Sequence, residues 1–532
     1  MRQRRLLVST ICLALLAGLA QGAGRRKPRQ YKRSHRKAWT CIDQGRYQAA
    51  IDVLAPAPEA PPDDAETLYL LAIAHAHRKD FDQATAHVRK ALQAGLPLER
   101  FLAGPRDWTK PLTASAKFQE LLKKHGGPLV HGPMLGSVTD TTATFWVRTP
   151  REATVGVHVQ ETRNSLLDFA KAPRATAKAG EDGDWTAVVK VGGLKPGGGY
   201  DYGISVDGKP ATQHTGTFHT LPKPGSKGKF TVAFGGGAGY VPANERMWDV
   251  ILRHRPAALL MLGDNVYIDT PKSPNVQRYL YYRRQSRPEW RRLVARTPVY
   301  AIYDDHDFGT NDCVPGHQTF EPAWKPKVWK VFKQNWANPA YGGGPRQPGC
   351  WFDFRIGDVH VILLDGRYYR SLKKKSMLGP VQKTWLLETL RTSPGTFKVL
   401  ASPVPWAPGT KGKSRDTWDG FPDEREEIFA FIEKHNVDGV VLLSADRHRS
   451  DAWKIERRNG YDLYEFESSR LTNQHVHPRM SKALFSYNKK QSFGRIDFDT
   501  TAPNPTVTYR IINIENEEVY KLTLTKSQLT HK

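Results

Sequence analysis

Six short apolar segments, each followed at once by polar residues, constrain the fold of this chain more than any other feature. Helical stretches separate several of them, and the segments are KFTVAFGGG, AALLMLGDN, TPVYAIYDD, VHVILLDG, FKVLASPVPW and DGVVLLSAD. Continuous runs of Val, Leu and Ile are typical of strands buried on both faces of an α/β sheet. Ligands bind such sheets at the carboxyl ends of the strands. We therefore expect an α/β domain over residues 228–525, with its site built from several strand ends.

Four of the strand ends gather carboxylates, imidazoles and guanidinium groups. Clustered carboxylates repel each other unless a positive group lies among them, and a metal ion is the obvious candidate. Oxygen ligands with one or two imidazoles suit iron(III), manganese, calcium or zinc in a two-metal site. The four ends supply Asp264, Asn265 and Tyr267; Asp304, Asp305, His306 and Asp307; Asp365, Arg367 and Arg370; and Asp446, Arg447, His448 and Asp451.

A pair of metal ions would give this site a definite chemistry. Two cations held together clamp a phosphoryl group and lower the pKa of a bound water, which becomes the nucleophile. Arginines can hold the remaining phosphoryl oxygens in bidentate fashion. Each motif alone has a structural alternative, because an aspartate after a strand is often a helix cap or a turn former. Four clusters in series after apolar segments favour the metal site.

The order of these motifs and the residues within them resemble those of a known family. The segments LGDNVYID, YDDHDFGTND, LLDGRYYR, LGPVQKTWL, DTWDGFPDEREEI and LSADRHRSDAW are similar to the alkaline phosphatase D (PhoD-like) family, within the calcineurin-like metallophosphoesterase superfamily. The similarity covers roughly residues 228–500. It implies a calcineurin-like α/β metallophosphatase sandwich, preceded by a β-sandwich, in an exported phosphatase or phosphodiesterase that typically holds iron and calcium.

The resemblance also implies roles for individual residues. Asp264 would bridge the two metal ions, Tyr267 would bind iron as a phenolate, and Asp305, Asp446 and His448 would complete the ligand set.

A second group of residues would act on the substrate. His306 would protonate the leaving group or hold the phosphate, and Asn265, Arg367 and Arg447 would contact substrate oxygens. We expect Asp304 or Asp307 to accept a hydrogen bond from His306, which would raise the pKa of the histidine.

One departure from the family pattern concerns the first strand end. Relatives with the tyrosine–iron site carry a cysteine there, whereas Gly237 occupies that position in VAFGGGAGY. The family's iron assignment is therefore in question, and zinc or manganese are alternatives. Water, Asp304, Asp269 or a rearranged loop could replace the cysteine. The glycine run itself is either a tight turn beside the metals, which we favour, or a backbone cradle for phosphate.

The amino-terminal segments predict export. Met1–Arg5 is basic, Leu6–Leu19 is apolar, and small residues follow, so residues 1–23 are typical of a secretory signal peptide. Residues 24–37 (GRRKPRQYKRSHRK) are expected to form a solvated basic linker. No later stretch is apolar for the ~18 residues of a membrane span. We expect a secreted or periplasmic protein.

Two further domains are expected before the α/β domain. Residues 38–125 are predicted to be helical, and a 34-residue offset pairs Tyr47 with Phe81 and Ala50 with Ala84, as in a tetratricopeptide repeat. A plain stack of helical hairpins is the alternative. Residues 127–221 alternate apolar and polar residues between turns, which predicts a fibronectin type III-like β-sandwich with Tyr202 as its corner tyrosine.

The remaining inferences concern partners and cysteines. The chain has 79 Lys and Arg against 53 Asp and Glu, for a net charge of +26, which suits an anionic phosphate ester or cell envelope but equally a solvated surface. The helical segment could recruit a protein partner. No helix-turn-helix or zinc-finger signature indicates sequence-specific nucleic-acid binding. Cys313 and Cys350 could pair as a disulfide.

Three functions compete on this sequence. The first is a secreted metal-dependent phosphoesterase acting on monoesters or diesters, and the second is a degenerate relative that binds phosphate, polymer or protein without turnover. The third is another hydrolase on the same scaffold, such as a sulfatase. The sequence does not separate monoester from diester activity, and it leaves the oligomeric state open.

Overall fold

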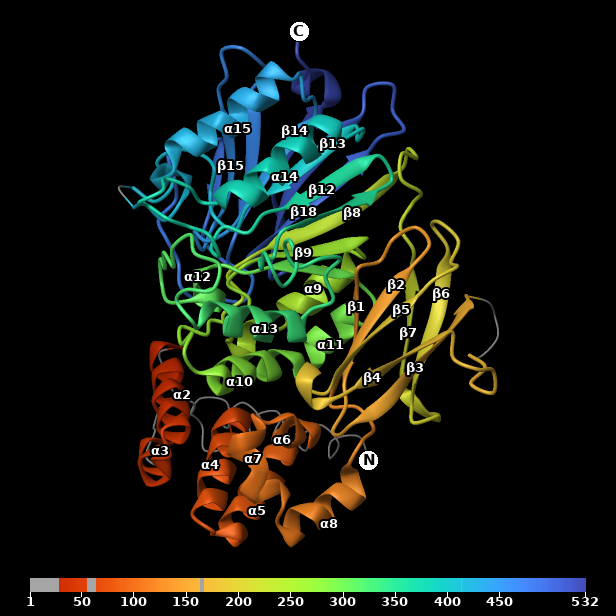
Figure 1. Cartoon of the computed structure of the whole chain (residues 1–532), viewed down its shortest axis with the longest axis vertical. Helices are drawn as coiled ribbons and strands as arrows, with labels where there is room; N and C mark the ends of the chain where they lie inside the picture. Colours follow the sequence, from red (N-terminus) through yellow and green to blue (C-terminus); the bar gives the residue numbers. More distant parts are fainter. Residues whose placement is uncertain (1–27, 55–63, 163–166, 413) are drawn as a thin grey trace, which may run out of the picture. The chain divides into compact units, whose positions relative to one another are not determined.

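The computed structural model describes residues 28–54, 64–162, 167–412 and 414–532 (Figure 1). The chain divides into two compact units, one of residues 1–96 with Ala114–Gln119, the other of Pro97–Thr113 with Glu120–Lys532. The predicted signal peptide lies outside the described residues. No helix among the described residues combines the length and apolar character needed to cross a membrane.

The first unit is helical, and its first helix corrects one prediction. Helix α2 spans Pro28–Asp43, so most of the predicted basic linker is helical. His35 and Ala38 are buried, and the Nε2 atom of His35 lies 2.8 Å from the hydroxyl of Thr67. The basic residues of this run share a helix with apolar ones, which is why a charge count alone mistook it for a linker.

The predicted 34-residue offset appears in the helices. Helix α3 (Tyr47–Leu54) and helix α5 (Phe81–Gln93) begin at the two paired positions, with α4 (Ala65–His77) between them. Ala50 and Ala84 are both fully buried. The helical prediction is confirmed here, while the assignment to tetratricopeptide repeats stays a prediction.

The two compact units divide the predicted helical segment of residues 38–125. Helices α6 (Glu99–Ala103) and α7 (Arg106–Thr113) belong to the second unit, whereas α8 (Ala116–His125) begins in the first. Arg100 is fully buried and donates to the carbonyl oxygens of Gly104 at 2.6 Å and Tyr279 at 3.4 Å. These long-range contacts were invisible in the local helical pattern.

The predicted β-sandwich is present as two antiparallel sheets. Tyr202 is buried as expected, but its hydroxyl donates to the carbonyl oxygen of Ala295 at 2.8 Å, outside the sandwich. It therefore anchors the sandwich to the α/β domain and is not a corner tyrosine. The sheets have the orders β1-β2-β5 and β4-β3-β6-β7, with strands β1 (His131–Gly136), β2 (Ala143–Arg148), β3 (Ala153–Glu161), β4 (Ala175–Ala179), β5 (Thr186–Val191), β6 (Gly199–Val206) and β7 (Lys209–His219).

The α/β domain contains two mixed sheets. Strands β8, β9 and β10 are parallel in the first sheet, and β12, β13, β14 and β16 are parallel in the second. The first has the order β10-β9-β8-β18-β19-β20, with β8 (Lys229–Gly235), β9 (Ala258–Leu262), β10 (Val299–Ile302), β18 (Ser492–Asp499), β19 (Thr506–Asn513) and β20 (Glu518–Thr525). The second has the order β11-β12-β13-β14-β16-β15-β17, with β11 (Phe352–Ile356), β12 (Val359–Leu363), β13 (Phe397–Ala401), β14 (Val440–Ser444), β15 (Ser450–Ile455), β16 (Leu463–Ser468) and β17 (Phe485–Tyr487).

Helices cover the two sheets on their outer sides. Figure 1 shows α14 and α15 over the sheet of β12–β15, and α9, α11 and α13 beside β9. The six apolar segments predicted from the sequence are the buried strands β8, β9, β10, β12, β13 and β14. The helices are α9 (Met247–Arg253), α10 (Pro274–Gln285), α11 (Pro288–Val294), α12 (Asp305–Phe308), α13 (Lys325–Asn335), α14 (Gly379–Thr392) and α15 (Pro422–Lys434).

The predicted disulfide does not form. Cys313 and Cys350 are both free thiols, as is Cys41. Cys350 is fully buried, and its backbone N–H donates to the carboxylate of Asp365 at 2.9 Å. The pairing suggested by their proximity in the sequence is therefore wrong.

Candidate metal centre

The predicted ligands meet where strands of both sheets end. Asp264 follows β9, Asp305 follows β10, and Asp446 follows β14. Each of Asp264, Asp305 and His306 offers one ligand atom within 4.8 Å of the other two, and the same holds for Asp304, Asp305 and Asp446. The strand ends thus bring together carboxylates that are as much as 142 positions apart, as Asp304 and Asp446 are.

Asp264 carries the strongest indication of a bound cation. The residue is 1% exposed, and neither of its carboxylate oxygens has a hydrogen-bond partner among the described residues. Burial raises its pKa well above the usual value, and the nearby carboxylates of Asp305 and Asp304 raise it further against the opposing effect of His306. Buried polar atoms without partners are costly and rare. A metal ion at this point would satisfy both oxygens, so the residues fit one.

Tyr267 and His448 lie beside Asp264. The Tyr267 hydroxyl is 2.8 Å from Nε2 of His448, and that nitrogen is 3.8 Å from Oδ2 of Asp264. Burial lowers the pKa of His448 well below its usual value, and the neighbouring imidazoles add to the effect. The ring is therefore neutral, which is the form that binds metal ions. The three predicted ligands form one cluster of oxygen and nitrogen donors.

Backbone strain is concentrated at the same residues. Asp264, Tyr267, Asp446 and His448 have φ angles of +54°, +58°, +73° and +48°. A left-handed conformation costs a residue other than glycine on the order of 1 kcal/mol, and such residues gather at functional sites. The fold therefore maintains four predicted ligands in conformations that need support from their surroundings.

Asp307 provides part of that support. Its carboxylate accepts hydrogen bonds from the backbone N–H of Asn265 at 2.8 Å and of Val266 at 2.9 Å. The side-chain amide of Asn265 donates to the same carboxylate and to the carbonyl oxygen of Ile302 at 2.9 Å. Asp307 thus holds the loop that carries Asp264 and Tyr267. Asn265 is 1% exposed, and its Oδ1 atom has no hydrogen-bond partner among the described residues. Its predicted contact with substrate stays a prediction.

The partner of His306 differs from the predicted one. Nδ1 of His306 lies 2.5 Å from Oδ1 of Asp269, not beside Asp304 or Asp307. Burial opposes protonation, but Asp264, this hydrogen bond and Asp305 together raise the pKa of His306 to about 11. The ring also stacks on Tyr267, with 4.6 Å between ring centroids. Asp269 was absent from the predicted role because it lies 37 positions away.

Arg367 pairs with buried carboxylates of the protein, and its predicted contact with substrate stays a prediction. Its guanidinium group is fully buried, pairs with Asp304, and donates to Oδ1 of Asp416 at 2.6 Å. Arg370 donates to the same oxygen at 2.7 Å, and Nζ of Lys411 lies 2.7 Å from Oδ2. Burial opposes ionisation, but these cations hold the pKa of Asp416 well below its usual value. The sequence analysis assigned no part to Asp416 or Lys411.

Arg447 lies at the edge of the centre. Its guanidinium group is 3.3 Å from Oδ2 of Asp446, and the residue is 7% exposed. Its Nε–H has no hydrogen-bond partner among the described residues. The predicted contact of Arg447 with substrate oxygens therefore stays a prediction.

Two histidines that the sequence analysis missed lie near His448. His475 and His477 follow β16, and each offers a nitrogen within 4.8 Å of the others and of His448. Asn473, in the same segment, donates from Nδ2 to the Tyr267 hydroxyl at 2.6 Å. Two histidines at alternate positions after the last parallel strand, in NQHVH, were the signal available in the sequence.

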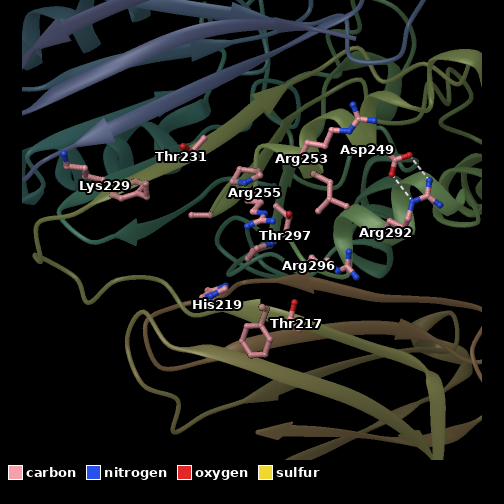
Figure 2. Close-up of a pocket in the computed structure, with 16 residues that line it drawn as sticks. Thr217, His219, Lys229, Thr231, Asp249, Arg253, Arg255, Arg292, Arg296 and Thr297 are labelled. Carbon is pink, nitrogen blue, oxygen red and sulfur yellow. Dashed lines mark hydrogen bonds and ion pairs between the residues drawn. The ribbon is translucent and has the colours of Figure 1, made fainter. Parts of the chain in front are cut away.

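A large cavity lies elsewhere in the molecule. It has a volume of about 1150 Å³ and is lined by residues of β7, the start of β8, helices α9 and α11, and the residues that directly precede β9 and β10 (Figure 2). Arg292 and Asp249 face each other there, with hydrogen bonds of 2.9 and 2.7 Å. Because the metal ligands lie at the opposite, carboxyl ends of these strands, the cavity is separate from the centre.

Comparisons with known proteins agree with this architecture. Residues 232–532 match the family model described as PhoD-like phosphatase, and residues 127–223 match a domain of unknown function (DUF7800). Alkaline phosphatase D of Bacillus subtilis (strain 168) is 37% identical over 82 residues, which are 14% of this chain and 14% of that protein. The aligned part is thus a small fraction of that relative's length.

Two solved structures share the fold. The structure of PhoD superposes with a TM-score of 0.63 at 18% identity, covering 75% of this chain and 90% of the other. Purple acid phosphatase PPD1 from yellow lupin seeds has a TM-score of 0.56 at 11% identity and covers 75% of each chain. At these identities the likeness shows a common α/β phosphatase fold.

Proposed function

This chain belongs to the PhoD-like phosphatase family, and from that premise we propose that it is a metal-dependent phosphoesterase which hydrolyses phosphate monoesters or diesters. The observation that carries the metal dependence is Asp264, whose two carboxylate oxygens are buried without hydrogen-bond partners. Among the described residues no hydrogen bond satisfies these oxygens, and only the charge of His306 offsets them, so a bound cation would remove a substantial cost of burial.

The ligand set of the proposed centre follows from the geometry. Asp264, Tyr267 and His448 would hold one ion, and Asp305 and Asp446 would hold the other, with Asp264 between them. Bound ions would offset the charge of the phosphoryl group and acidify a water molecule. The family's pairing of iron and calcium remains a proposal here, with zinc or manganese as alternatives, because Gly237 supplies no ligand.

His306 is the residue proposed to act on the leaving group. Asp269 accepts from Nδ1–H of His306, so Nε2 is the nitrogen that can donate a proton or a hydrogen bond. The side chain is 18% exposed, more than the carboxylates around it, and can therefore reach a substrate. A general acid in this position protonates the departing alkoxide oxygen. Arg447 is proposed to contact phosphoryl oxygens.

Charge and location fit an anionic substrate outside the cell. The net charge of +26 would attract phosphate esters by long-range electrostatics. We propose export through the predicted signal peptide, which sequencing of the mature amino terminus would test. A protein partner of the helical segment is likewise proposed.

Elemental mass spectrometry and turnover test the function together. We expect about two ions per mature chain, and hydrolysis of p-nitrophenyl phosphate or bis(p-nitrophenyl) phosphate that a chelator abolishes. The ratio of the two rates assigns monoester or diester preference. A chain that binds no ion after supplementation and hydrolyses neither ester would contradict the proposal and favour a non-catalytic binding protein.

A further inference from the structure

The position of Gly237 cannot hold a side chain in this fold. Gly237 has a φ angle of +64°, and a Cβ atom built on it would lie 1.9 Å from the carbonyl oxygen of Ser469. The segment after β16 lies directly against the glycine. The backbone N–H of Asn473 donates to the carbonyl oxygen of Gly237 at 3.1 Å, and that of Leu471 to Gly236 at 3.1 Å. A cysteine at position 237 would displace this segment.

The segment that takes this space carries nitrogen ligands. Asn473 fixes its start, because Nδ2 donates to Tyr267 at 2.6 Å while Oδ1 accepts from the backbone N–H of His475 at 3.0 Å. The rings of His475 and His477 then lie 5.0 and 5.4 Å from the ring of His448, between centroids. The close approach permitted by Gly237 therefore delivers two imidazoles to the side of the centre that lacks the cysteine.

His448 gives an independent indication of a ligand at this point. The residue is only 6% exposed, and its Nδ1 atom has no hydrogen-bond partner among the described residues. A buried imidazole nitrogen without a partner is costly unless something else satisfies it. One nitrogen each from His448, His475 and His477 lie within 4.8 Å of one another, so a single ion could contact all three.

We propose that His475 and His477 join His448 as ligands of a divalent transition-metal ion, zinc in particular, and replace the cysteine that Gly237 excludes. The inference rests on the proposed function, since it names ligands of the same centre. It assigns this chain a metal centre built on imidazole nitrogen.

The donor set decides the kind of ion. Three imidazoles suit zinc, and beside them the ion would keep a position for Tyr267, Asp264 or a water molecule. Neutral imidazoles add no negative charge, in contrast to a cysteine thiolate, so the site favours a divalent over a trivalent ion. A tetrahedral zinc ion about 2.05 Å from each nitrogen would separate the nitrogens by roughly 3.3 Å. The nitrogens lie within 4.8 Å of one another, and the small closure that remains is accessible because His475 is exposed.

Metal binding by the full chain tests the proposal without reference to turnover. The chelator-treated protein is titrated with Zn²⁺ against a chromophoric competitor, and separately with Co²⁺ while visible absorption is recorded. H475N/H477N should weaken the affected Zn²⁺ site by about 100-fold or more and remove the intense absorption of tetrahedral Co²⁺. His435→Asn is the matched control, because His435 is an exposed histidine at the end of α15, and it should change neither readout.

The outcomes separate this inference from the proposed function. Unchanged Zn²⁺ affinity and Co²⁺ absorption in H475N/H477N would overturn the inference, and the proposed function would stand if esters are still hydrolysed. Loss of Zn²⁺ in the variant of a chain that hydrolyses no ester would support the inference and overturn the proposed function.

A second variant tests the geometry without removing a donor. His477→Cys offers a thiolate at the same position, so bound Co²⁺ should gain a sulfur-to-cobalt absorption in the near ultraviolet. Absence of that absorption, in a variant with the unfolding midpoint of the parent, would overturn the inference.

Discussion

Asp264 and Asp416 lie in the same acidic region and are compensated in opposite ways. Asp416 receives Arg367, Arg370 and Lys411, so the protein neutralises it with its own cations. Asp264 is equally buried, yet its oxygens accept no hydrogen bond from any residue that the structure describes. The difference separates a carboxylate that holds the structure together from one kept for an external cation. Residue type alone gives no hint of it, since both are aspartates in a chain of net charge +26.

The largest expected effect is the loss of activity when Asp264 is replaced. Asp264→Asn should lower kcat/KM by about 1000-fold or more, because a metal ligand contributes several kcal/mol to transition-state stabilisation. The chelator-treated variant should be as stable as the parent or more so, since a crowded buried charge is removed. Asp423→Asn, at a side chain that is 78% exposed, serves as the control. Full activity in Asp264→Asn would break the comparison.

Replacing Asp416, which the protein's own cations compensate, should lower the stability of the fold. Asp416→Asn leaves the buried guanidinium groups of Arg367 and Arg370 and the half-buried ammonium group of Lys411 short of a partner. We therefore expect a loss of about 3–5 kcal/mol in the free energy of unfolding, measured in urea. Glu388→Gln removes an exposed pair with Arg391 and should leave the midpoint unchanged. An Asp416→Asn protein that keeps its stability but loses its metal would place Asp416 with the ligands.

The next prediction concerns the close contact between Gly237 and the segment that follows β16. Gly237→Ala combines a left-handed backbone with a contact at 1.9 Å, and should cost about 3 kcal/mol. Gly409→Ala isolates the backbone part, because Gly409 has a φ angle of +77° and nothing within 4 Å of its added Cβ, and should cost about 1 kcal/mol. Equal losses in the two variants would mean that the close approach contributes nothing.

Glu465 is an intermediate case, compensated by hydrogen bonds alone. Burial raises its pKa to about 7, while Ser444 and the backbone N–H groups of Trp406 and Ala407 partly oppose this. Because the folded pKa exceeds the ordinary value of 4.5, its contribution is fully present below pH 4.5 and is lost as pH rises through about 7. The loss is on the order of 3 kcal/mol. In Glu465→Gln, the plot of unfolding free energy against pH should be flatter over that window. An unaltered slope would mean that other groups cause the pH dependence.

The smallest expected effect concerns the hydrogen bond between Asp269 and His306. Asp269→Asn should lower kcat about tenfold by weakening the orientation of the ring. It should also lower the pKa of His306 and move the basic limb of the pH–rate profile to lower pH. Asp304→Asn tests the partner that the sequence suggested, and a larger shift of the limb in that variant would reverse the assignment.

The sequence predicted the strands and most of the ligands because both are local signals. An apolar run followed by Asp264, Asp305 or Asp446 indicates a strand and its polar end without knowledge of the rest of the chain. The substrate contacts of Asn265 and Arg367 stay predictions, because a polar side chain at a strand end can turn either to substrate or into the protein. Only neighbours distant in sequence, such as Asp416 for Arg367, decide between the two.

By itself, the sequence determined the α/β domain, the preceding β-sandwich and the cluster of acidic strand ends, since hydrophobic periodicity and family motifs are local features of the sequence. The tertiary structure decided which charges cancel. It paired Asp269 with His306, surrounded Asp416 with cations, left Asp264 without a partner, and placed the NQHVH segment against Gly237. The physical reason is that electrostatic compensation depends on distance in space, and these partners come together only when the two sheets bring their strand ends to one place.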